Sequence, residues 1–121
     1  MNFNLTSEQK LIKQTAADFS RDELREGAVD RDKNKIWPKE QIAKMANLGF
    51  MGMMVDENWG GSGLDTISYC IAMEEVSKVD ASAGVIMSVN NSLVCYLLNK
   101  YGSEHIKTKY LISLAKGDKL G

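Results

Sequence analysis

The hydrophobic pattern of this chain is dominated by residues 81–99, which carry no charged side chain although 26% of all residues are charged. Drawn as a helix, this stretch is apolar on nearly every side, which predicts the enclosed central element of a domain. Its middle, Asn90-Asn91-Ser92, is nevertheless polar. Because buried amides must find hydrogen-bond partners or line a wet or ligand-filled space, this polar turn is the best functional clue in the sequence.

The remaining apolar pattern predicts four further helices, over residues 7–26, 38–48, 66–79 and 104–115. Each predicted boundary coincides with a residue type that favours a helix end. A Ser/Thr-x-x-Glu/Gln capping box precedes the first helix, and a proline suits the first turn of the second. The bounding residues are Thr6, Pro38, Gly49, Asp65 or Thr66, Asp80, Gly102 and Ser103.

Three segments should connect these helices. Residues 21–35 are dense in charges of both signs and are expected to form a solvated helix end and loop. Residues 50–55 are apolar but too few for a full helix, so they should tuck under the core. Residues 56–64 hold three glycines without the spacing of a dinucleotide or P-loop motif, which favours an ordinary connection over a phosphate cradle. The sequence therefore predicts an all-α fold, an orthogonal bundle of about five or six helices.

Composition narrows the functional classes. A length of 121 residues with 44% apolar residues is typical of one soluble globular domain. A net charge of −1 gives no electrostatic reason to expect nucleic acid or an anionic membrane as a partner. Residues 81–99 approach the length of a membrane span, but their polar centre argues against insertion. The first residues lack the pattern of a signal or transit peptide, so we expect a cytoplasmic protein.

The titratable residues offer little catalytic chemistry. Cys70 and Cys95 lie in apolar helical segments and are expected to be buried reduced thiols, with a disulfide or a catalytic thiol as alternatives. His105 is the single histidine and is expected at the surface. Glu74 and Glu75 are adjacent, a spacing that cannot build a helical-bundle iron site, so no metal site is expected. They are expected to cap, pair or face solvent.

One helical stripe remains as a candidate binding surface. Four residues of the central stretch recur at i, i+3, i+4 and i+7, which places them on one face of a helix. Such a stripe is most often core, but the asparagine at its centre raises the chance that it borders a cavity. The four residues are Ile86, Val89, Asn90 and Leu93.

Three sequence blocks resemble the acyl-CoA dehydrogenase family: NWGGSGLD at 58–65, AMEEVS at 72–77 and VIMSVNNSL at 85–93. The opening LTSEQKLI and the later YGSEHIKTKYL are similar to the same family, and all five blocks occur in its order. The third block most resembles the short-chain, butyryl-type members. Trp59 stands where the family usually has tyrosine.

The resemblance implies that residues 1–121 are the family's N-terminal helical domain, followed in such enzymes by a β-domain and a second helical domain. Family members bind FAD, usually form homotetramers and oxidise acyl-CoA to trans-2-enoyl-CoA, passing electrons to electron-transfer flavoprotein. A glutamate base removes the α-proton while hydride goes to the flavin. That glutamate and the segment contacting flavin lie beyond the position of Gly121, so this chain is expected to hold no catalytic, cofactor-binding or metal-binding residue and to be inactive alone.

The resemblance also assigns a role to the helical stripe. It places Ile86, Val89 and Leu93 on the wall of the acyl pocket, with Asn90 at its centre. The branched side chains of Ile86 and Val89 would fill that pocket and favour short acyl chains. The helices should also expose an apolar patch that other domains cover in the family. The alternative is a freestanding helical binding or interaction module without catalytic activity.

Overall fold

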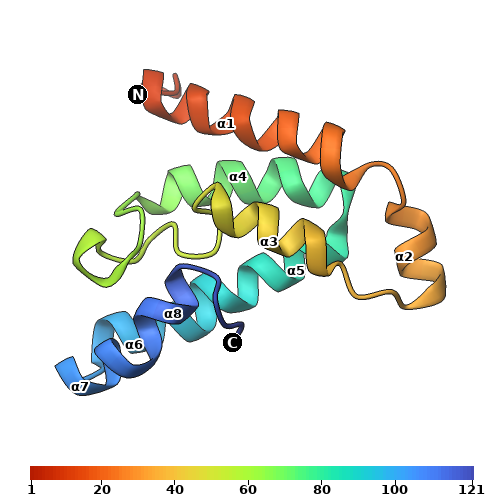
Figure 1. Cartoon of the computed structure of the whole chain (residues 1–121). Helices are drawn as coiled ribbons and strands as arrows, with labels where there is room; N and C mark the ends of the chain where they lie inside the picture. Colours follow the sequence, from red (N-terminus) through yellow and green to blue (C-terminus); the bar gives the residue numbers. More distant parts are fainter.

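The computed structural model describes all 121 residues and contains helices but no strands (Figure 1). The first helix is α1 (Ser7–Phe19), which continues as a π-helical turn, η1 (Ser20–Leu24). Then follow α2 (Ala28–Asn34), α3 (Lys39–Asn47), a short 3₁₀ turn η2 (Glu57–Trp59) and α4 (Thr66–Val79).

The predicted central stretch is one continuous helix built from α5 (Ala81–Ser88), the π-helical turn η3 (Val89–Cys95) and α6 (Tyr96–Tyr101). We call it the long helix. The last helix is likewise continuous, from α7 (Glu104–Ile106) through η4 (Lys107–Leu111) to α8 (Ile112–Ala115). Counting continuous helices, the all-α bundle has six, which confirms the predicted fold class.

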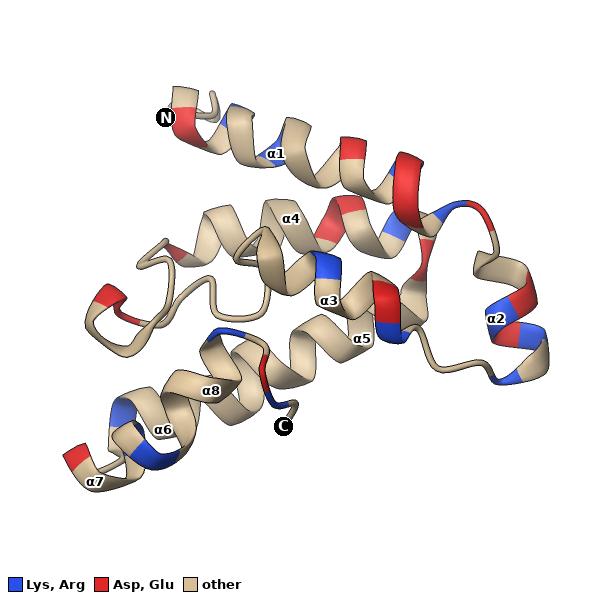
Figure 2. Ribbon diagram, viewed as in Figure 1, with Lys and Arg blue, Asp and Glu red and all other residues tan.

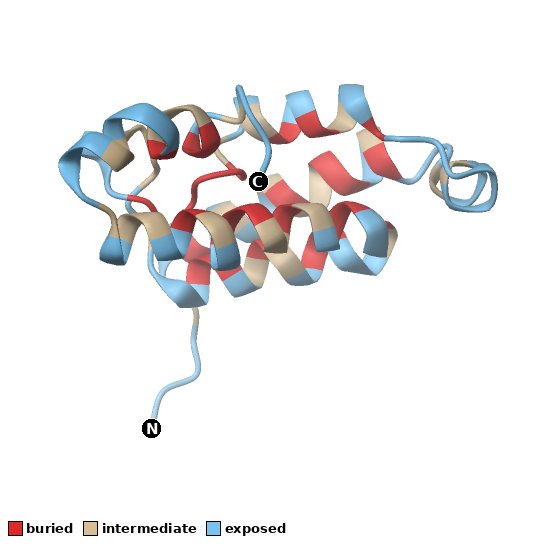
Figure 3. Ribbon diagram, turned by 90° about the horizontal axis from the view of Figure 1, so that it is seen from below, coloured by how far each residue is buried: buried red, intermediate tan, exposed pale blue.

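The helices pack around two apolar clusters. In Figure 1, α1 lies along α4, and α3 and the long helix pack below that pair. The larger cluster joins buried residues of α1, α3, α4 and α5 with the apolar segment after α3. The smaller cluster lies between the long helix and the last helix, and its buried members are Val55, Cys95, Leu111, Leu114 and Ala115. Figure 3 shows the buried residues on the facing sides of the helices.

The predicted helix starts are confirmed by hydrogen bonds at their caps. The Thr6 hydroxyl accepts from the Gln9 amide at 3.1 Å while the Gln9 side chain accepts from the Thr6 amide, a complete capping box. Asp65 caps α4, Asp80 caps α5 and Ser103 caps α7 in the same way. Gly49 closes α3 with φ 79°, as predicted.

Three predictions from the sequence were wrong. Residues 21–35 contain the helix α2, and Arg31 within it is only 12% exposed because it forms an ion pair with Asp80. Cys70 is exposed, since α4 buries its neighbour Tyr69 instead; Cys95 is buried, and both thiols are free. The long helix is not enclosed, because one side of it is exposed along its whole length.

The long helix, Ala81–Tyr101, is long and apolar enough to cross a membrane, with a mean hydropathy of 1.4 in its most apolar window. Only 33% of that window is buried in this chain. Length and hydropathy alone are met equally by core helices, so they give only weak support for a span. The exposed apolar side, which the sequence predicted as a patch, is the feature that bears on function.

Candidate functional site

The exposed side of the long helix is mainly apolar. We call its apolar residues the outer face, and they are Val85, Val89, Leu93, Tyr96 and Leu97. The exposed Ser92, whose hydroxyl donates to the Ser88 carbonyl, is a polar residue on this side. Val85 is 62% exposed and Leu93 55% exposed, while Val89 is half-buried. Figure 2 shows that α5 carries no charged residue, in contrast to α1 and α2. A contiguous apolar surface of this kind marks a binding or docking site more often than chance exposure.

Three of the four predicted site residues lie on or next to this surface. Val89 and Leu93 belong to the outer face, and Ile86 lies at its edge, half-buried against the larger apolar cluster. The structure thus leaves Val89 and Leu93 free to meet a ligand or another domain. The chain does not by itself close them into a pocket.

Asn90, the fourth predicted residue, does not border a cavity. It is 0% exposed, and its amide nitrogen donates to the Met51 carbonyl at 2.8 Å and to the Leu114 carbonyl at 3.1 Å. Its Oδ1 accepts from the Gly121 amide at 3.0 Å. Both amide protons are therefore used inside the chain, and a substrate contact by Asn90 finds no support in the structure. Spacing placed it in the stripe, but hydrogen bonding turns it inward.

Asn91 is held in the same manner. Its amide nitrogen donates to the carbonyls of Phe50 and Met87, at 2.7 and 2.9 Å, and its Oδ1 accepts from the Met53 amide at 2.8 Å. Three of the partners of the two asparagines lie in residues 50–53, which we call the strap. The strap has an irregular backbone, and the asparagine side chains supply partners for three of its groups, the Phe50 and Met51 carbonyls and the Met53 amide.

Helix geometry explains how two adjacent asparagines both face inward. Asn90 and Asn91 follow the fully buried Met87 by three and four residues, and residues at these spacings share one helix face. The side chains of both are therefore buried together with Met87. In the same stretch the Tyr96 amide bonds to the Asn91 carbonyl five residues earlier, the pattern of a π-helical turn. Inserted π-helical turns of this kind are frequent at functional sites.

A separate cavity lies between α2 and the start of the long helix. It has a volume of about 460 Å³ and includes Trp37 and Pro38 on one side and Val85 and Ile86 on the other. The Arg31–Asp80 ion pair also lines it. It touches the predicted stripe only at Ile86, so it is not the predicted acyl site.

The glycine-rich connection, residues 56–64, does not form a phosphate cradle. The amides of Gly60, Gly61 and Gly63 donate to carbonyls of Glu57, Asp56 and Val55, within the same part of the chain. A Cβ on Gly61 would lie 2.1 Å from the Val55 carbonyl oxygen, which explains the close approach that glycine allows here. With these amides already paired, this connection offers no free glycine amides to the phosphates of a cofactor.

The titratable groups form no catalytic cluster. Glu75 pairs with Lys78 at 2.9 Å, Glu74 also pairs with Lys78, and His105 is exposed, as the sequence predicted. Burial raises the pKa of the Cys95 thiol to about 11, so it is protonated and unreactive near neutral pH. No group of three or more His, Cys, Asp or Glu residues is placed to hold a metal ion.

The sequence pattern does not reveal the ion pair between Arg31 and Asp80. The Arg31 guanidinium donates to Asp80 at 2.9 Å and to the carbonyls of Leu24 and Glu26, so it links the end of η1, α2 and the start of the long helix. Its only trace in the sequence is one arginine within a run of mixed charges. The complementary half, Asp80, was identified as a cap but not as an ion-pair partner.

Comparison with known proteins gives consistent matches along the chain. Residues 6–118 match the model of the acyl-CoA dehydrogenase N-terminal domain. The short-chain specific acyl-CoA dehydrogenase of Clostridium acetobutylicum is 44% identical over 121 residues, which is 100% of this chain but 32% of the relative. The chain thus spans about a third of the length of the curated relatives it matches.

Solved structures share the fold over the whole chain. Butyryl-CoA dehydrogenase from Megasphaera elsdenii matches with a TM-score of 0.91 at 37% identity, covering 100% of this chain and 32% of that one. A chain in the structure of the electron transferring flavoprotein of Acidaminococcus fermentans matches with a TM-score of 0.95 at 43% identity, with the same coverage. More distant matches, at 27% and 30% identity, include structures with FAD.

Proposed function

This chain belongs to the acyl-CoA dehydrogenase family and corresponds to its N-terminal domain, and from that premise we propose that it is part of an enzyme that oxidises short-chain acyl-CoA to trans-2-enoyl-CoA. Within that enzyme its contribution is one wall of the acyl pocket. The observation that carries the proposal is the outer face of the long helix, an apolar surface on which Val89 and Leu93 stand exposed or half-buried without a partner in this chain.

The preference for short chains follows from the side chains on and beside that face. Val89 and Ile86 are branched at Cβ, and Leu93 is bulky, so together they leave little depth for an acyl tail. An acyl group of four carbons fits beside such a wall, whereas each added methylene must displace a side chain that the helix holds in place.

The remaining parts of the reaction belong to residues outside this chain. FAD supplies the hydride acceptor, and the family's glutamate supplies the base, so this domain neither holds the flavin nor moves a proton. We further propose that the enzyme passes its electrons to electron-transfer flavoprotein and that it assembles as a homotetramer. The chain's own part is apolar contact with the acyl tail and exclusion of water from it.

The test uses the full-length protein, with flavin bleaching by acyl-CoA as the measurement. We expect bleaching with butyryl-CoA, and we expect Val89→Gly to raise the ratio of kcat/KM for hexanoyl-CoA over butyryl-CoA by about tenfold, because one methylene in an apolar pocket changes discrimination by at least that factor. Val29→Gly in α2 is the matched control. Val29 is 80% exposed, and its helix contributes no residue to the outer face.

Two results would contradict the proposal at different levels. If Val89→Gly left the hexanoyl-to-butyryl ratio of kcat/KM unchanged, or if Val29→Gly changed it equally, the outer face would not form the wall of the acyl pocket. If the full-length protein took up no flavin and oxidised no acyl-CoA, the proposed enzymatic function would be wrong, and the freestanding binding module would be favoured.

A further inference from the structure

We propose that Asn90 and Asn91 are positioning residues that set the outer face of the long helix, an inference that rests on the proposed function of that face. Neither side chain reaches the outer face, because both are turned into the chain, with exposures of 0% and 2%. They act on an acyl group only through the helix that they hold.

The two asparagines hold the helix mainly through main-chain groups, with one further contact from the Asn90 amide nitrogen to the Cys95 sulfur at 3.8 Å. Their four amide protons go to the carbonyls of Met51, Leu114, Phe50 and Met87, and their two Oδ1 atoms accept from the amides of Gly121 and Met53. Such partners are present whatever side chains the strap carries. The hold therefore depends on the asparagines and is insensitive to the sequence opposite them.

The hold also fixes the rotation of the long helix about its axis. Asn90 and Asn91 lie on the inner side of the helix, while Val89 and Leu93 lie on the outer face. Because all four side chains project from one helix, a rotation that broke the asparagine hydrogen bonds would also turn Val89 and Leu93. The wall that they form would then change its position relative to an acyl group.

The experiment compares variants of the full-length protein by two measurements. Asn91→Leu removes all three side-chain hydrogen bonds of Asn91 at similar size. We expect faster hydrogen exchange in a peptide spanning the strap, since the Met53 amide loses its acceptor, and a hexanoyl-to-butyryl ratio of kcat/KM raised by about tenfold with flavin retained. Asn91→Gln, which keeps the amide donor and acceptor on a side chain one methylene longer, should give a smaller change in both.

Two variants separate the positioning role from other effects. Asn99→Leu, an amide on α6 whose Oδ1 has no hydrogen-bond partner, should change neither measurement. Val89→Gly should change the chain-length ratio without changing exchange at the strap. Where Asn91→Leu fails to fold or loses flavin, Asn91→Gln carries the comparison.

Faster exchange with an unchanged chain-length ratio would overturn the positioning role, since the asparagines would then support the fold alone. Unchanged exchange would overturn the hold itself. A wild-type protein that oxidises no acyl-CoA would instead overturn the proposed function, and the two failures are distinguishable because exchange is measured without substrate.

Discussion

The long helix is held by buried polar groups at two places that differ in charge. At its start, Asp80 caps α5 through the Ala83 amide and pairs with Arg31, and the two charged side chains are 8% and 12% exposed. In its middle, Asn90 and Asn91 use neutral amides, and their partners are main-chain groups apart from the Cys95 sulfur. The charged corner joins three helices through one specific partner, whereas the asparagine turn joins the helix to irregular backbone.

The difference lies in what each place loses when one group is removed. A buried ion needs its counter-charge because water is excluded. Removing one member of a buried ion pair therefore leaves the other charge unpaired and destabilises the fold. Neutral amides leave neutral carbonyls and amides behind, each with a smaller desolvation cost. The charged corner should therefore matter most for stability, and the asparagine turn should matter most for the shape of the outer face.

The largest expected effect is that of Asp80→Ala. It leaves the buried Arg31 guanidinium without its counter-charge and removes the cap of α5, so we expect a loss of about 3–5 kcal/mol in the free energy of unfolding. Urea denaturation measures it. Asp65→Ala is the matched control, because Asp65 caps α4 without an ion pair and its removal should cost distinctly less. Equal losses in the two variants would mean that the ion pair adds nothing beyond a cap.

Asn90→Ala should have the next largest effect. It leaves the Met51 and Leu114 carbonyls and the Gly121 amide without a side-chain partner, and we expect a loss of about 2–3 kcal/mol in the free energy of unfolding. Asn99→Ala on the same helix should cost little, since the Oδ1 of Asn99 is already buried without a partner. A loss in Asn90→Ala no larger than in Asn99→Ala would remove the distinction between a satisfied and an unsatisfied buried amide.

At the charged corner, the sequence predicted the local interaction, the Asp80 cap, and missed the distant one, the ion pair with Arg31. Asp80 was predicted as a cap because a cap bonds within three residues, a spacing visible in the sequence. Arg31 lies 49 residues from Asp80, within a run of mixed charges whose members all resemble solvated side chains. Nothing in local spacing separates a buried arginine from its exposed neighbours.

The asparagine turn was visible only as a conflict between polarity and burial. Its resolution is main-chain hydrogen bonding to residues 39 and 41 positions away, which leaves no side-chain pattern to recognise. A second difference is that the predicted stripe grouped Asn90 with Val89, although neighbouring residues point about 100° apart and Asn90 lies on the inner side with Met87. Element boundaries, in contrast, were predicted closely because caps and glycines act locally.

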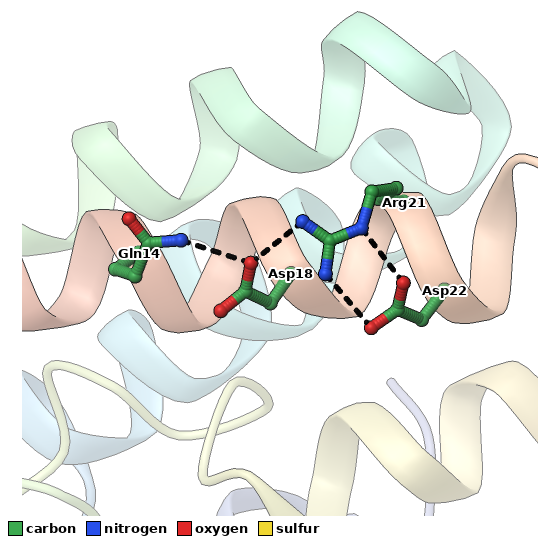
Figure 4. A network of polar contacts seen from close by, with 4 residues as sticks. All are labelled: Gln14, Asp18, Arg21 and Asp22. Carbon is green, nitrogen blue, oxygen red and sulfur yellow. Dashed lines mark hydrogen bonds and ion pairs between the residues drawn. The ribbon is translucent and has the colours of Figure 1, made fainter.

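The polar network on α1 and η1 is exposed, in contrast to the two buried sites on the long helix. Its removal should have the smallest effect on stability. Figure 4 shows Arg21 between Asp18 and Asp22, with Gln14 donating to Asp18 at 2.9 Å. The guanidinium donates to both carboxylate oxygens of Asp22, at 2.8 and 3.0 Å, and its hydrogen bonds hold the pKa of Asp22 below the ordinary value. Water surrounds the pair, so its charges are screened and little stability depends on it.

Arg21→Ala should therefore separate a pKa change from a stability change. The pKa of Asp22 should rise toward its ordinary value, as followed by NMR titration of its carboxyl group, while the urea midpoint at neutral pH stays unchanged. Because the folded-state pKa of Asp22 lies below its unfolded value, any stabilisation is present above the ordinary carboxyl pKa, near pH 4, and is lost as the pH falls through the folded-state pKa. A loss at neutral pH comparable to that of Asn90→Ala would show that exposure does not weaken a polar tie in this fold, and the contrast between buried and exposed groups would fail.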